Sequence, residues 1–149
     1  MIVPYTIGTV IERVRDHVPA LRVVGGAADY ASAYVRAPAA MPAAFVVLSG
    51  EQIDSESSSG LLITTIRAQI DVCVVVRSYA AAKRGEAHLD EQAQIIAQVR
   101  ACLNGWRPAL GADIVETMRG SGEARVLRFD ADSLWWVDPY EVTYRARIT

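Results

Sequence analysis

Apolar and mixed positions alternate along the whole of residues 61–76. One set of alternate positions is almost entirely apolar, and it comprises Leu62, Thr64, Ile66, Ala68, Ile70, Val72, Val74 and Val76. A period of two is typical of a strand with one buried face. A strand of this length would extend about 50 Å at about 3.3 Å per residue. We therefore expect either a bulge that bends it or a hairpin arm that projects from the domain.

Two other segments have the helical period, and they cover residues 6–18 and 86–106. Thr6 is a candidate N-cap for the first helix, and Gly105 and Pro108 end the second. The expected core stripes are Ile7, Val10, Ile11, Val14 and Val18 in the first helix, and Leu89, Ala93, Ile96, Val99 and Leu103 in the second. Each stripe predicts one helix face against a sheet.

The remaining segments predict shorter strands and loops. Strands are expected at 21–24, 43–50 and 125–132, and a last strand runs from 134 or 135 to the C-terminus. Residues 25–42 are rich in Gly, Ala and Pro, which favours a loop or an extended arm. The acidic, serine-rich residues 51–60 suit a flexible loop or a hairpin tip. Residues 105–123 are expected to be connecting chain with at most one short strand.

This order of elements predicts an α+β two-layer sandwich in a single domain, residues 1–149. The sheet should be mostly antiparallel with four or five strands, and two helices should pack on one face. Residues 25–60 would contain a loop or an extended hairpin arm.

The composition of the chain argues against some classes of function. The chain has 149 residues, 52% hydrophobic and 21% charged, with a net charge of −2. No apolar stretch approaches the roughly 18 residues of a membrane span, and the N-terminus does not resemble a signal peptide, so we expect a soluble protein in the cytoplasm. Scattered arginines in an acidic chain argue against sequence-specific nucleic-acid binding.

The chain carries none of the common catalytic or nucleotide-binding motifs, and we assign no catalytic, cofactor or metal residue. Cys73 and Cys102 lie outside any metal spacing and are expected to be buried. The acid pairs Asp54/Glu56 and Asp130/Asp132 fit turns and loop tips better than a metal site. A small metal-dependent enzyme remains an alternative, which a metal-dependent rise in melting temperature would support.

Adjacent tryptophans 135 and 136 must point to opposite faces of a strand, so one of them lies on the second face or at an edge. Polar residues of the long strands share that second face, where they would line a lumen, meet a neighbouring subunit or face solvent. Our candidates for a subunit or tube interface are Arg67, Gln69, Asp71, Arg77, Trp135, Arg145 and Arg147.

The order and pattern of these elements resemble the phage tail terminator family of long-tailed phages. The resemblance rests on the N-terminal amphipathic helix, ITTIRAQIDVCVVVRSY, DEQAQIIAQVRACLNGWRP and RVLRFDADSLWWVDPYEVTYRARIT. It implies a virion protein that forms a homohexameric ring on the head-proximal end of the tail and is assembled in the host cytoplasm. The implied partners are other copies, the tail tube protein and the head-tail connector or stopper protein, and genome DNA could pass through the ring. A head-tail joining protein of the neck is the alternative.

Overall fold

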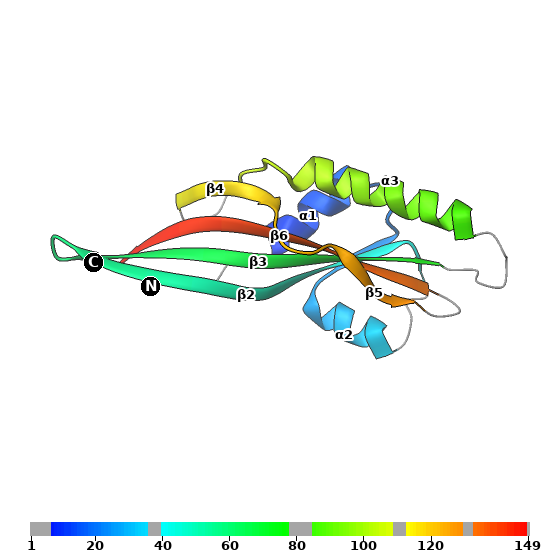
Figure 1. The fold of residues 1–149 in the computed structure, drawn as a ribbon, viewed down its shortest axis with the longest axis horizontal. Helices are drawn as coiled ribbons and strands as arrows, with labels where there is room; N and C mark the ends of the chain where they lie inside the picture. The colour runs from blue at the N-terminus through cyan, green and yellow to red at the C-terminus, as the bar shows by residue number, and fades with distance from the viewer. Residues whose placement is uncertain (1–6, 36–39, 78–84, 109–112, 130–132, 149) are drawn as a thin grey trace.

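The computed structural model describes residues 7–35, 40–77, 85–108, 113–129 and 133–148, and it forms an α+β fold around one mostly antiparallel sheet (Figure 1). The elements are α1 (Gly8–His17), β1 (Val23–Gly25), α2 (Ala27–Val35), β2 (Ala43–Ser58), β3 (Leu61–Arg77), α3 (Gly85–Leu103), β4 (Asp113–Gly120), β5 (Arg125–Phe129) and β6 (Ser133–Ile148). The main path of the sheet is β1-β2-β3-β6-β4, and β5 also pairs with β6. The α+β class and the antiparallel pairing are confirmed. The sheet has six strands rather than four or five.

The long strands β2, β3 and β6 extend beyond the helices as an arm (Figure 1). The β2–β3 pairing continues out to Ser58 and Leu61, and a register shift lies between Leu48 and Gly50. Ser59 and Gly60 close the hairpin with φ of 52° and 79°. Two positive φ values match the twist of a two-residue hairpin turn. Of the two alternatives for residues 51–60, the hairpin tip and the projecting hairpin arm are confirmed. The flexible loop was wrong, because pairing along β3 overrides the weak strand propensity of serine and acidic residues.

The first face of the sheet packs against α1 and α3, as the apolar stripes predict (Figure 1). α1 contributes Val10 and Val14 to this core. Thr6 lies outside the described residues, and Ile7 stands at the N-cap of α1 without a side-chain cap. The buried side of α3 comprises Gln92, Ile95, Ile96, Val99, Cys102 and Leu103. Ala93 is exposed rather than buried, because a face centred on the two isoleucines removes more apolar area from water.

The second face has a helix of its own, which the sequence interpretation missed. α2 packs opposite α1 and α3 over Phe45, Cys73, Val75 and Trp135 (Figure 1). The rings of Phe45 and Trp135 stack at 6.4 Å, and Tyr30 of α2 meets both edge-on. Two corrections follow. The described residues form three helices rather than two, and these helices do not all lie on one face. Residues 27–35 form a helix because alanine favours helices and the tyrosines supply an apolar side.

The segment expected to be connecting chain with at most one short strand contains β4, and the strand expected at 125–132 is confirmed as β5; both pair with β6. β4 pairs with the part of β6 from Tyr140 to Arg145, and β5 pairs with the part from Leu134 to Val137. Between the two parts, the carbonyl of Pro139 accepts a hydrogen bond from Ser121 N at 3.0 Å. On the side away from β3, β6 therefore pairs with β5 before Pro139 and with β4 after it. It has a neighbouring strand on this side along most of its length.

Candidate assembly surfaces

The second face of the sheet has two parts with opposite character. We call the part under α2 the covered half, and its residues are Phe45, Cys73, Val75 and Trp135, all of them buried. The part on the arm is the open half. It is formed by residues that share the second face according to strand register: Gln52, Asp54, Glu56, Ile63, Thr65, Arg67, Gln69, Glu116, Arg119, Glu141, Thr143 and Arg145. The open half is almost entirely polar.

A ladder of polar contacts crosses the open half from β2 to β4. Arg67 donates from Nη1 to Gln52 Oε1 at 3.3 Å. Arg119 donates from Nε and Nη2 to Glu141 Oε1 at 3.1 and 2.9 Å, and its Nη2 lies 2.8 Å from Glu116 Oε2. Ser121 Oγ donates to Glu141 Oε2 at 3.0 Å. These contacts hold the charged groups in fixed positions.

Glu141 is the centre of this ladder. Burial opposes the charged form of its carboxyl, but hydrogen bonds from Arg119 and Ser121 outweigh burial and lower the pKa of Glu141 below its usual value. The group therefore stays ionised in the folded protein at neutral pH. It can anchor the arginine of β4 on the face that a partner would meet.

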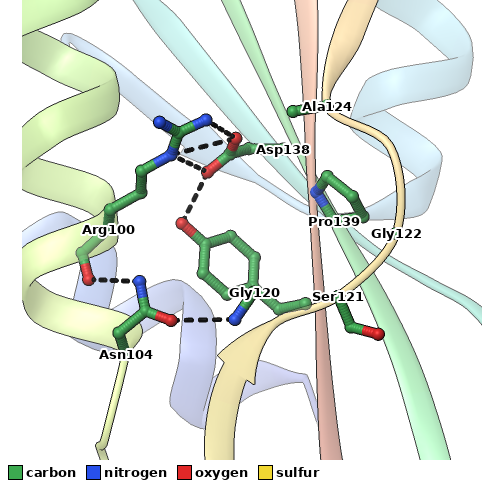
Figure 2. A pocket seen from close by; sticks show the side chains of 9 residues that line it. Arg100, Asn104, Gly120, Ser121, Gly122, Ala124, Asp138 and Pro139 are labelled. Carbon is green, nitrogen blue, oxygen red and sulfur yellow. Dashed lines mark hydrogen bonds and ion pairs between the residues drawn. The ribbon is translucent and has the colours of Figure 1, made fainter.

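A second polar cluster lies on the other side of β6, in a pocket of about 170 Å³ between α3 and the β4–β5 connection (Figure 2). Arg100 donates to both oxygens of Asp138 at 3.1 and 2.7 Å, and Tyr140 Oη donates to Asp138 Oδ2 at 2.6 Å. Burial and the bond to Asp138 raise the pKa of Tyr140. Asn104 accepts from Gly120 N at 2.8 Å. The carboxylate is saturated by its own chain, so the cluster fastens α3 to the sheet rather than presenting a reactive group.

The sequence matches the family described as phage tail terminator protein over residues 1–149. The chain belongs to the phage tail terminator family. This is a family of structural proteins of the phage tail, and the chain is accordingly a virion protein without a catalytic assignment. No curated protein matches the sequence.

One solved structure supports the fold of this terminator chain. It is a chain of the "Virion of native gene transfer agent (GTA) particle", with a TM-score of 0.57 at 14% sequence identity. The match covers 97% of this chain and 100% of that chain. At this identity the likeness extends to the fold alone.

The structure brings three of the predicted interface residues of this terminator together. Arg67, Gln69 and Arg145 lie on the open half. Asp71 lies where the open half meets the covered half, and burial raises the pKa of its carboxyl, against hydrogen bonding from Ser49. Arg77 is exposed at the far end of β3, next to Ser133 and away from the arm.

Two of the predicted interface residues, Trp135 and Arg147, remain to be placed. Trp135 is 1% exposed beneath α2, so its side chain belongs to the core of this chain and does not reach the surface. Its placement as a surface contact was wrong, because residues 27–35, expected to be a loop or an arm, form the helix that covers it. Arg147 stands opposite Ile63 in the β3–β6 register, and its side chain lies outside the described residues.

Sequence reasoning missed Glu116, Arg119 and Ser121, because their segment was interpreted as connecting chain. Met118 is buried on the first face while its neighbours Thr117 and Arg119 are not. That alternation, together with the β-branched Ile114–Val115 pair, was the available signal for a strand.

The cysteines and acid pairs add no reactive site. Both cysteines are buried, as expected, and burial raises the pKa of Cys73 to about 12. Asp54 and Glu56 are exposed on β2, and Asp130 and Asp132 lie outside the described residues. Within the described ranges no group of three metal-ligating side chains occurs. The helices in those same ranges are too short or too polar to cross a bilayer.

Proposed function

We propose that this protein caps the tail tube as a homohexameric ring. The ring sits on the head-proximal end of the tube, stops its polymerisation and provides the surface for the head-side connector or stopper protein. Membership of the tail terminator family carries this proposal. The fold shared with a chain of a gene transfer agent virion also supports it.

The arm and its open half fit the physical requirements of such a ring. A closed ring needs two different surfaces on each subunit that complement one another after a fixed rotation. Interfaces between folded subunits are also commonly polar outside their centres. We place Arg67, Gln69, Asp71, Arg145 and Arg147 at a neighbouring subunit or the lumen, through which genome DNA could pass.

Termination follows from geometry and needs no reaction. One side of such a ring carries the same contact surface as a ring of the tube, so the ring can join the tube end. The other side lacks this surface and offers no site for the next tube ring. The tight polar ladder around Glu141 suits this role, because a fixed surface loses little conformational entropy on docking.

The test is assembly of the purified protein alone and with tail tubes. We expect six-fold rings in negative-stain images, and tube polymerisation reactions that stop at shorter lengths when the protein is added. A stable monomer that neither binds tubes nor changes their length contradicts the proposal. Co-sedimentation with isolated tails rather than isolated heads separates a terminator from a neck protein that joins the head first.

A further inference from the structure

The sheet has an open edge on each side in the part of the chain that the structure describes. On one side this edge is β2 along the arm, because β1 pairs with β2 only from Ala43 to Phe45, while β3 pairs with it out to Ser58. On the other side it is β5, which pairs with β6 alone among the described strands. An open edge is a template for a strand of another chain.

Side chains along both edges are exposed. Residues 52–58 of β2 are all exposed. Ile53 in this segment is 59% exposed, and Val126 and Phe129 of β5 are 50% and 62% exposed. Among the large hydrophobic residues that the structure describes, these three have the highest exposed fractions. The most exposed apolar side chains thus lie on the two open edges, where an added strand would cover them.

The arm edge of β2 is acidic on the second face of the sheet and apolar on the first. Asp54 and Glu56 lie on the second face. Ile53 lies on the first face, since it stands opposite the core residue Ile66. The ion pairs between described residues do not include either acid.

β5 has the complementary pattern. Its pairs with β6 are Arg125 with Val137, Val126 with Trp136, Arg128 with Trp135 and Phe129 with Leu134. Because Trp135 lies under α2, the two arginines share the second face and the two apolar residues share the first. Leu127 is the extra residue of a bulge between Val126 and Arg128. β5 is therefore basic on the face where the arm is acidic, and apolar on the face where the arm carries Ile53.

We propose that residues 53–56 of β2 pair with β5 of a second copy of this chain and so continue its sheet. β2 runs parallel to β6 and β5 runs antiparallel to β6, so two copies that present the same face meet as antiparallel strands. One register matches both faces at once, and it places Ile53 opposite Phe129, Asp54 opposite Arg128, Ser55 opposite Val126 and Glu56 opposite Arg125. Opposite charges and apolar pairs at directly opposed positions both stabilise such a contact.

Contact between two identical edges is disfavoured. Two β2 edges would bring the acids of both copies together, and two β5 edges would bring the arginines together. The contact is therefore heterologous, as a ring requires, and this inference rests on the proposed ring function.

The proposed register also gives the projecting arm a role. Ile53 lies level with Tyr144 in its own chain, through Ile66, and would lie level with Leu134 in the neighbour, through Phe129. From Leu134 to Tyr144 is ten residues of β6, so neighbouring copies would be offset by about 33 Å along the strands. The arm can span this offset because its strands extend beyond the helices (Figure 1).

The first test exchanges the charges of one proposed pair. A full-length chain with Glu56→Arg and another with Arg125→Glu each place like charges at the contact. We expect sedimentation velocity to show that half assembly needs about tenfold more protein for each chain alone, and the natural amount for their equimolar mixture. Glu12→Arg and Arg22→Glu, at exposed positions outside the contact, are the matched controls and should assemble as the natural chain does.

A second test fixes the register with single cysteines. Chains with Ser55→Cys and Val126→Cys should form a disulfide dimer on a non-reducing gel when they are mixed under mild oxidation, because directly opposed residues lie within disulfide reach. A Gln52→Cys chain mixed with the Val126→Cys chain should not, because residue 52 lies on the other face. The natural cysteines are both buried.

Several outcomes would overturn the inference. Unchanged assembly of either charge-reversed chain alone, or failure of the mixture to recover it, contradicts the contact, while rings of the natural chain leave the ring function standing. Disulfide dimers of the Ser55→Cys chain alone would indicate a two-fold contact and contradict it as well. If circular dichroism shows that a charge-reversed chain is unfolded, the cysteine pair decides. Absence of any oligomer of the natural chain, alone or on tubes, overturns the ring function together with the contact.

Discussion

The three long strands β2, β3 and β6 run through both the covered half and the open half of the second face. The two halves differ in whether the side chains on this face are buried. In the covered half Cys73 and Val75 are buried under α2, and their neighbours on the first face are buried as well, so β3 is enclosed from Val72 to Val76. In the open half Arg67 and Gln69 are exposed while Ala68 and Ile70 beneath them are buried. One strand thus combines a two-sided core segment with a one-sided arm segment.

This difference separates stability from assembly. Burial of apolar area is the main favourable term in folding, so the covered half should contribute more to stability than the open half. The open half retains charged groups in fixed positions, which favours specific contact with a partner. Substitutions on one strand can therefore affect different properties of the protein.

The largest expected effect is that of Trp135→Ala in the covered half. Removal of this buried side chain leaves a cavity under α2 and should lower the free energy of unfolding by about 3–5 kcal/mol. Arg67→Ala in the open half is the matched change and should alter it by no more than about 0.5 kcal/mol. Urea unfolding followed by circular dichroism measures both. Equal costs for the two variants would mean that the two halves do not differ in stability as described.

A smaller effect is expected from Glu141→Gln, which tests the polar ladder. The pKa of Glu141 is lower in the folded protein than in the unfolded chain. Its contribution to stability is thus fully present above the unfolded pKa and is lost as the pH falls through the folded pKa. We expect the natural chain to lose more stability between pH 6 and pH 3 than the variant loses. Glu123→Gln, at an exposed acid in the β4–β5 connection, is the control, and an equal pH dependence for natural chain and Glu141→Gln would contradict the ladder.

Arg77→Glu should have the smallest effect on stability, because the side chain is exposed at the end of β3. The free energy of unfolding should change by no more than about 0.5 kcal/mol. We nevertheless expect the variant to lose ring assembly, measured by light scattering, if the contact surface extends beyond the open half to this end of the sheet. Arg22→Glu, at another exposed arginine, is the matched control. Normal rings from the Arg77 variant would exclude this end of β3 from the contact surface.

Two strands of the arm, β3 and β6, were predictable because their periodicity is strong. The alternating positions from Thr64 to Val76 and the final apolar series, including Tyr140, Val142 and Tyr144, both appear in the structure as buried first-face positions, whereas Leu62 near the tip is exposed. A period of two is a local property of the chain, so it needs no knowledge of partners in space. The two main helices were found for the same reason.

The remaining elements depend on contacts between distant segments. α2 is short and rich in alanine, and its packing depends on Phe45 and Trp135, which lie far along the chain. β4 is irregular, with register shifts on either side of Glu116, so its alternation is broken. The ladder around Glu141 joins β6 to β4 and to Ser121, which follows β4. It could not be predicted from a single sequence whose β4 residues had not been assigned to a strand.

The turn at the end of the arm constrains how the arm can change in length. Ser59 and Gly60 close on the Ser58–Leu61 pair, and pairs of one hydrogen-bonding class recur at every second position of an antiparallel ladder. A hairpin that keeps this turn can thus grow or shrink only by two residues per strand, or about 7 Å at a time. The arm can therefore take only certain lengths. Homologous proteins with the same turn should have arms that differ in length by multiples of about 7 Å.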